Sequence, residues 1–214
     1  MMVYPIVDYL VGENKKFLEA NSGAYQKIAN QQNPKALMVM CADSRTPQNV
    51  FGPDGLNYLF TVKNIGNRVY DQRDGILGDV AYPIEHLNIP LAVVCGHSDC
   101  GAIKAAVGDY SGESKGTVHA LDQLKSAIDS VVCEGNDESL FSINQLTRSN
   151  IDFQIEKLMG AYADKFKSNE LVAIGYFVDF DGPKGYITNI NGVTDIDEIM
   201  KTSFSKLGNY FERD

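Results

Sequence analysis

Two short segments of this chain are apolar without interruption, and each leads to a residue that can bind a metal. Ala36–Met40 leads directly into Cys41, and Leu91–Cys95 leads through Gly96 into His97. Runs this short and continuous are typical of strands buried in a parallel sheet, because both faces of such a strand are covered. Ligands bind beyond the carboxyl ends of strands in open α/β sheets, so we expect the two loops to meet there.

The remaining hydrophobic pattern alternates between helical and strand periods. It predicts helices over Val7–Glu19, Gly75–Leu87, Cys100–Val107, Gly116–Leu124 and Ile151–Phe166, and further strands over Tyr58–Val62 and Leu171–Val178. This alternation predicts an α/β fold with a mostly parallel central sheet flanked by helices. We expect a single domain over residues 1–214, with an N-terminal helical arm (1–30), a core that holds the site (31–110), and helices with the last core strand (111–214).

Composition narrows the class of partner. The chain has 28 acidic and 19 basic residues and a net charge of −9, which argues against nucleic acid. No segment approaches the roughly 18 apolar residues of a membrane span. The start, Met1–Pro5, has no features of a signal peptide, so we expect a cytoplasmic protein that acts on a small molecule.

Cys41, His97 and Cys100 together form a candidate Zn²⁺ site. Two thiolates and one imidazole leave the fourth tetrahedral position open, as in catalytic rather than structural zinc sites. Ser98 or Asp99 is the expected N-cap of the following helix, which places Cys100 in its first turn, where the helix dipole favours a thiolate. A structural zinc with Asp43 as fourth ligand, and a Cys41–Cys100 disulfide or redox pair, are the alternatives; a reducing cytoplasm disfavours a stable disulfide.

Three other residues of metal-binding type are given structural interpretations. Cys95 lies inside an apolar run and is expected in the core, and Cys133 lies beside a polar turn. His119 has apolar neighbours at helical spacing and is also expected to be structural.

The motif Cys41-x-Asp43-Ser44-Arg45 is followed by Gly96-His97-Ser98-x-Cys100-Gly101-Ala102. This pair resembles the two signatures of the β-class carbonic anhydrases. Lys63–Val69 is similar to the family's Arg-Asn-x-Gly-Asn segment, Tyr82–Leu87 to its helix before the second ligand strand, and Gly175–Asp179 to its last core strand. The resemblance extends roughly from Glu13 to Val193.

The resemblance implies reversible hydration of CO₂ to bicarbonate and a proton by zinc-bound hydroxide. It assigns the metal to Cys41, His97 and Cys100. Asp43 would accept a hydrogen bond from the hydroxide, while Arg45 holds that carboxylate away from the metal. The family also implies a homodimer or a multiple of dimers, with an N-terminal arm that extends across the neighbouring subunit.

Further residues of the cleft follow from the same resemblance. Gln32 matches a glutamine that donates a hydrogen bond to substrate, Phe60 an apolar wall, and Tyr82 a cleft tyrosine; Gly101 leaves space beside the ligands. Gln32 and Phe60 are expected to serve the zinc of the neighbouring subunit. Tyr82 and His86, four residues apart in the expected helix, are candidates for proton transfer, with a hydrogen-bonded core role as the alternative for His86.

The chain departs from the family at three positions. Met38 stands where the subtype with a non-catalytic bicarbonate site has tryptophan, and the chain has no tryptophan, so we expect that site to be absent. Ala81 and Lys63 replace a common glutamate and a common arginine. These two changes are expected to alter hydrogen bonding in the cleft.

Two other functions fit the same residues. A hydrolase of carbonyl sulfide or carbon disulfide on this fold would use the same zinc hydroxide. A non-enzymatic zinc-thiolate module would instead need four protein ligands.

Overall fold

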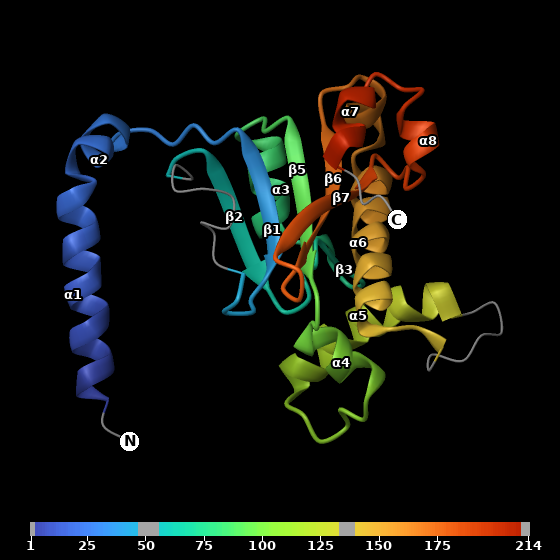
Figure 1. Ribbon diagram of the computed structural model, residues 1–214, viewed down its shortest axis with the longest axis horizontal. Coiled ribbons are helices and arrows are strands. Elements are labelled where there is room, and N and C mark those ends of the chain that lie inside the picture. Colours follow the sequence, from blue (N-terminus) through green and yellow to red (C-terminus); the bar gives the residue numbers. More distant parts are fainter. Residues whose placement is uncertain (1–2, 47–55, 133–139, 211–214) are drawn as a thin grey trace. The chain divides into compact units, whose positions relative to one another are not determined.

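The computed structural model describes residues 3–46, 56–132 and 140–210, which form two compact units divided between Asn33 and Pro34 (Figure 1). The first unit contains two helices, α1 (Tyr4–Ala20) and α2 (Ser22–Ile28). No residue of either helix is buried, and the apolar side chains of α1 are exposed. The helical arm expected at the start of the chain is therefore present as a unit of its own.

The second unit is built on a five-stranded sheet with the order β2-β1-β5-β6-β7. Its strands are β1 (Ala36–Cys41), β2 (Leu59–Asn64), β5 (Leu91–His97), β6 (Val172–Asp179) and β7 (Lys184–Ile190). The first four are mutually parallel and β7 is antiparallel to β6. The expected α/β fold with a mostly parallel sheet is confirmed, and β7 is an addition that the pattern did not predict.

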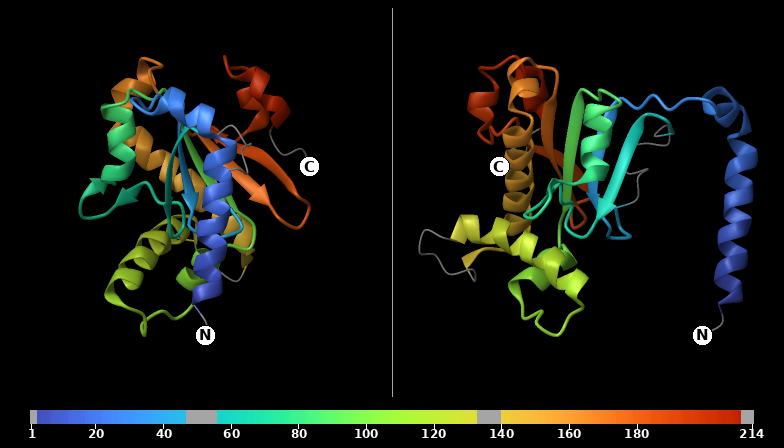
Figure 2. Two further views of the ribbon diagram at one scale, coloured as in Figure 1. Left: turned by 90° about the vertical axis from the view of Figure 1, so that its left-hand side faces the viewer. Right: turned by 180° about the vertical axis from the view of Figure 1, so that it is seen from behind.

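Helices α3 (Gly78–Glu85) and α6 (Ile143–Ala161) cover one face of this sheet. The main hydrophobic core lies between them and the strands: Val39, Val94 and Phe177 from the sheet pack with Ile84 of α3 and Ile155 of α6. Figure 2 shows both helices running along the sheet. The core fixes the ends of β1 and β5, where the candidate ligands lie.

Three helices bound the region below the carboxyl ends of β1 and β5. They are α4 (Gly101–Val107), α5 (Lys115–Val132) and the start of α6 (Figure 1). A second core cluster joins them to the ligand cysteines, with Ile103 of α4 and Leu121 and Leu124 of α5 packed with Cys41 and Cys100. The candidate site is therefore built between the sheet and a layer of helices.

Some element boundaries were predicted wrongly. The helix expected from Gly75 begins at Gly78, because Tyr70–Asp71 (β3) and Gly75–Ile76 (β4) form a short hairpin in which Gly75 has a φ of +79°. Helix α5 continues to Val132. Helix α6 begins at Ile143 rather than Ile151.

The chain ends in smaller elements that the pattern did not indicate. They are α7 (Ala163–Lys167), α8 (Ile196–Ile199) and the 3-10 helix η3 (Ser205–Tyr210). Ile199 and Leu207 pack against Ile187 and Ile190 of β7, so this segment supports the antiparallel edge of the sheet. Within the described ranges, no helix is long and apolar enough to cross a membrane.

Candidate metal centre

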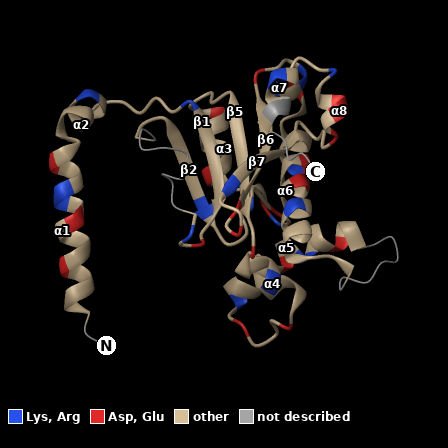
Figure 3. Ribbon diagram, in the orientation of Figure 1, with Lys and Arg blue, Asp and Glu red and all other residues tan. Residues whose placement is uncertain are grey.

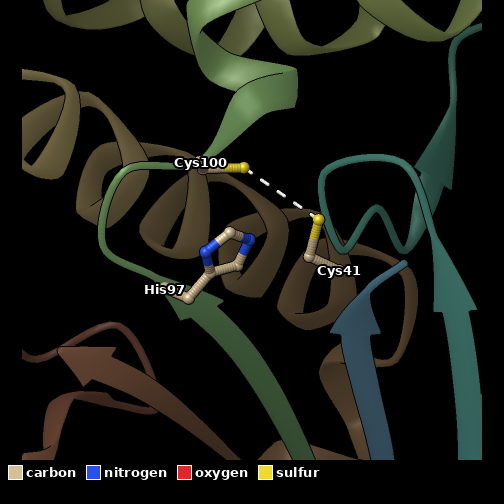
Figure 4. Close-up of side chains that lie close together, drawn as sticks. All are labelled: Cys41, His97 and Cys100. Atoms are coloured by element: carbon tan, nitrogen blue, oxygen red, sulfur yellow. Dashed lines mark hydrogen bonds between the residues drawn. The ribbon is translucent and has the colours of Figure 1, made fainter. Parts of the chain in front are cut away.

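The candidate ligands Cys41 and His97 come from neighbouring strand ends, and Cys100 from the start of the helix that follows (Figure 4). Cys41 is the last residue of β1 and His97 the last residue of β5, and these two strands are paired in parallel. Cys100 is itself the N-cap of α4, whose first helical residue is Gly101. The expectation of an N-cap at Ser98 or Asp99 was therefore wrong by one or two residues, because the tight turn with Asp99 at a φ of +56° delays the helix.

The ligand atoms of Cys41, His97 and Cys100 all lie within 4.8 Å of one another, and all three residues are buried. The two Sγ atoms are 4.0 Å apart, and both cysteines are free. Tetrahedral bonds of about 2.3 Å to one zinc would place two sulfurs about 3.8 Å apart, whereas a disulfide would bring them to about 2.05 Å. The spacing fits a shared metal rather than a covalent bond.

The histidine tautomer also suits a metal. His97 Nδ1 lies 2.9 Å from the carbonyl oxygen of Ser98, which can only accept, so Nδ1 carries the proton. Nε2 is buried and has no hydrogen-bond partner of ordinary geometry in the described part of the chain. A buried lone pair beside two thiols is costly to leave unpaired, and a cation would satisfy it.

The two thiols are inequivalent without a metal. The pKa of Cys41 falls to about 4, chiefly because the Cys100 thiol donates to it, with His97 and the Gly66 backbone N–H contributing against the opposing effect of burial. The pKa of Cys100 is raised by the same contact, by burial and by the Cys41 charge. The expected lowering at Cys100 is thus wrong for the metal-free pair. Metal binding must displace the proton that remains on the Cys100 thiol.

Asp43 lies at the edge of the ligand group and is held by Arg45. Arg45 Nε donates to Oδ1 at 3.1 Å and Nη2 to Oδ2 at 2.8 Å, while the Arg45 backbone N–H also donates to Oδ1 at 2.8 Å. These bonds hold the pKa of Asp43 well below its usual range. Oδ2 is 3.8 Å from His97 Nε2, so the carboxylate faces the ligands without belonging to their group.

Arg45 is itself fixed by residues that the sequence did not single out. Nη2 also donates to the carbonyl oxygen of Asp99 at 3.2 Å, and the guanidinium lies 5.0 Å from the ring centre of Phe180. The same Phe180 ring is 5.4 Å from the ring of His97. Phe180 comes directly after β6, and no signal in the local sequence distinguishes it from an ordinary apolar residue.

Lys63, which stands in place of the family's common arginine, supports the Asp43 turn. Its Nζ donates to the carbonyl oxygen of Thr46 at 2.6 Å and to that of Asp43 at 3.3 Å. Met38, another residue that departs from the family pattern, lies on β1 and is buried beside Cys95 on the far face of the sheet. Ala81 is half-buried on α3.

A cavity of about 330 Å³ opens beside the ligands. Its walls include Cys41, Asp43, Ile65, Gly101 and Leu121. A Cβ atom on Gly101 would meet nothing within 4 Å, so the glycine leaves the cavity open as expected. The walls are mostly apolar, which suits a small, nonpolar molecule.

Phe60, Tyr82 and His86 form a separate aromatic cluster. The ring centres of Phe60 and Tyr82 are 6.2 Å apart, and those of Tyr82 and His86 are 5.1 Å apart. Phe60 pairs with Leu37, four residues before Cys41, which corresponds to about 13 Å along the strand. None of the three lines the cavity beside Cys41. Tyr82 and His86 are exposed, so the core role for His86 is wrong.

The remaining candidates are Gln32, Cys95, His119 and Cys133. Gln32 is exposed and belongs to the first compact unit, and its role stays a prediction. Cys95 is fully buried, as predicted, and burial raises its pKa to about 12. His119 contacts Asp71 and Arg73 at 2.5 and 2.9 Å, in keeping with a structural role. Cys133 lies outside the described residues.

Comparisons with known proteins agree on one family. The sequence model of the family described as carbonic anhydrase matches residues 36–184. Carbonic anhydrase 2 of Mycobacterium tuberculosis is 27% identical over 157 residues, which is 72% of this chain and 74% of that protein. Beta carbonic anhydrase 3 of Arabidopsis thaliana is 37% identical over 103 residues, which is 45% and 40% of the two chains.

Solved structures show the same fold. The β-carbonic anhydrase CcaA superposes with a TM-score of 0.73 at 22% identity, covering 87% of each chain. The Coccomyxa β-carbonic anhydrase, solved in complex with acetazolamide, gives 0.71 at 19% identity, covering 96% of this chain and 95% of that chain.

Proposed function

The chain belongs to the β-class carbonic anhydrases, and on that premise we propose that it hydrates CO₂ reversibly with a Zn²⁺ ion bound by Cys41, His97 and Cys100. The observation that carries this proposal is the buried group of two thiols and one imidazole at the ends of β1 and β5. Three protein ligands leave one tetrahedral position for water. Bound zinc lowers the pKa of a coordinated water to about 7 and so supplies a nucleophile at neutral pH; carbonic anhydrase is the standard case of this effect.

The protein's own residues prepare the reaction in several ways. His97 presents Nε2 because its Nδ1 proton is held by the Ser98 carbonyl. Asp43, ionised and fixed by Arg45, offers a carboxylate oxygen at the edge of the ligand group, where it could accept a hydrogen bond from a water bound there. Arg45 also keeps this carboxylate from filling the open position.

The apolar cavity beside Cys41 is the proposed entry for CO₂. Gly101, Ile65 and Leu121 give it a largely apolar wall, with Asp43 and Glu113 as the charged residues of the lining. The negatively charged product leaves past Arg45, the exposed cation paired with Asp43.

We assign Gln32, Phe60, Tyr82 and His86 to the cleft of a neighbouring subunit. Support for this comes from the separation of about 13 Å along β1 between the level of Phe60 and Cys41, together with the exposure of Tyr82 and His86. A homodimer or a multiple of dimers would bring this cluster to a second metal site. A solved relative from Sordaria macrospora, 22% identical with a TM-score of 0.72, is described as tetrameric.

Two properties complete the proposal. Free thiols at the metal site suit a reducing compartment, and we assign the protein to the cytoplasm. Among the described residues no fourth ligand joins the group, and this favours a catalytic centre over a structural zinc-thiolate module.

The test is stopped-flow CO₂ hydration by the purified protein before metal removal, after removal and after addition of Zn²⁺. We expect hydration to be lost with the metal and restored by one equivalent of zinc. Undiminished hydration by the metal-free protein would reject the proposal. Parallel turnover of carbonyl sulfide distinguishes the related hydrolase, which would prefer that substrate.

A further inference from the structure

The turn after β2, residues 66–69, touches the candidate site on one side and helix α6 on the other. On the site side, the Gly66 backbone N–H helps to lower the pKa of the Cys41 thiol, and the preceding Ile65 lines the same cavity as Cys41. The carbonyl oxygen of Asn64 accepts from the Ala42 backbone N–H at 2.8 Å. In Figure 4 this turn passes beside Cys41.

On the helix side, two buried amides hold both ends of the turn. The Val69 N–H donates to Gln154 Oε1 at 2.9 Å, Gln154 Nε2 donates to Asn150 Oδ1 at 3.1 Å, and Asn150 Nδ2 donates to the Gly66 carbonyl oxygen at 3.0 Å. The three bonds form one chain, in which each amide uses one donor and one acceptor. The chain closes a loop from Val69 back to Gly66.

The two amides of this chain are buried, so their hydrogen bonds are needed and also orient the turn. Asn150 is 0% and Gln154 is 1% exposed, and they lie one turn apart on the face of α6 that contacts the sheet. Apolar side chains surround this face, where an amide costs free energy unless its hydrogen bonds are satisfied. Hydrogen bonds fix direction as well as contact, so they orient the turn as an apolar pair would not.

The turn itself needs such an anchor. Gly66 has a φ of +74° and Asn67 a φ of 47°, a backbone conformation that most residues avoid. A Cβ atom on Gly66 would lie 2.5 Å from Leu124 Cδ2, so the turn sits closely against α5 as well. A strained backbone of this kind persists only where the surrounding structure holds it in place.

We propose that Asn150 and Gln154 are positioning residues for the metal centre, which hold the Gly66 N–H against the Cys41 sulfur through the 66–69 turn. This inference rests on the proposed function, because it concerns retention of the same metal. Neither amide touches the ligands. Loss of a group that hydrogen-bonds a metal ligand typically changes metal affinity by about 10- to 100-fold, and the two amides would act through such a group, the Gly66 N–H.

The decisive variant is Gln154→Met, which keeps the length of the side chain and removes both of its hydrogen bonds in the chain of amides. The matched control is Gln123→Met. Gln123 is also a buried glutamine, 4% exposed, and it accepts a backbone N–H from Gln72 at 3.0 Å in a different loop. Both variants remove a buried amide, so they control for the general cost in stability.

The readout is Zn²⁺ affinity measured by competition with a chromogenic chelator, together with hydrogen exchange at Gly66. We expect Gln154→Met to bind zinc at least about tenfold more weakly and to exchange the Gly66 amide faster, with Gln123→Met within twofold of the parent protein. Equal zinc affinity of Gln154→Met and the parent would overturn the inference and leave the proposed function intact. A parent protein that binds no zinc would reject both.

A measurement on the unaltered chain covers the case in which Gln154→Met does not fold. In the ¹¹³Cd-substituted protein, a hydrogen bond from the Gly66 N–H to a metal-bound Cys41 sulfur should give a measurable coupling between the cadmium and that amide proton. A resolved coupling supports the inference. Its absence, with cadmium bound, overturns it.

Discussion

Asp152 on α6 is a carboxyl group whose burial makes the stability of the protein depend on pH. Burial raises its pKa to about 6, against the opposing effects of a hydrogen bond from Asn189 Nδ2 at 2.7 Å and the charge of Arg148. A carboxyl with a higher pKa in the folded chain binds more protons when folded than when unfolded. The free energy of unfolding therefore falls as the pH rises from about 4 to about 6 and stays reduced above that range.

The Asp152→Asn variant removes this cost. The interval between the ordinary carboxyl pKa of 3.8 and about 6 corresponds to about 3 kcal/mol at pH 8. The new amide oxygen still accepts from Asn189, so the hydrogen bond is retained. For a chain of this size about 1 kcal/mol shifts Tm by about 2–4 °C. We expect the variant to exceed the parent protein in stability by about 1.5 kcal/mol at pH 5 and by about 3 kcal/mol at pH 8.

The assay is equilibrium urea unfolding at fixed protein concentration from pH 5 to pH 8, which also keeps any oligomer constant. Glu156→Gln is the control, because Glu156 is an exposed carboxylate one turn further along α6 and its loss changes the net charge equally. A stability difference between Asp152→Asn and the parent that does not change with pH would refute the reasoning. So would a variant less stable than the parent at pH 8.

Three further predictions concern the site. Arg45→Ala removes the bonds that hold Asp43, so CO₂ hydration measured by stopped flow should fall at least about tenfold; unchanged turnover would show that the pair has no catalytic part. His86→Ala should lose rate in dilute buffer and recover it in concentrated imidazole, and equal loss at all buffer concentrations would remove the proton-transfer role. Gly96→Ala places a Cβ atom 2.8 Å from Ile151 Cδ1, so chemical denaturation should show a loss of about 1–3 kcal/mol, and no loss would contradict the packing beneath His97.

The sequence predicted those parts of the site that depend on an uninterrupted run of neighbouring residues. The uninterrupted apolar runs before Cys41 and His97 identify two buried strands, and strand ends place the ligands. Helix α6 was predicted to start eight residues late, although Ser142 and Gln145 form a capping box that the sequence displays.

The supporting parts of the site depend on contacts between distant segments. Phe180 and Gln154 act through neighbours that lie far away in sequence, and their residue types predict an ordinary core side chain and a solvated one. Gln154 can be buried because its side chain accepts a hydrogen bond from the Val69 backbone N–H, 85 residues away in the sequence. A hydrophobic pattern assigns such an amide to the surface, because it cannot include a partner of this kind.

The thiol pair must lose its remaining proton before both sulfurs can bind a metal. In the metal-free protein Cys100 donates to Cys41, whereas two thiolate ligands require both protons to be absent. Zinc affinity should therefore fall as the pH is lowered. Apolar side chains, among them Ile103 and Leu121, pack against the pair.

X-ray absorption at the zinc edge of the purified protein tests the central claim most directly. We predict one zinc per chain with two sulfur ligands at about 2.3 Å and two nitrogen or oxygen ligands at about 2.0–2.1 Å, of which one is water. The Cys100→Ser variant should lose stoichiometric zinc. A full complement of zinc in that variant, or a zinc coordinated by four protein side chains at every pH, would contradict the account.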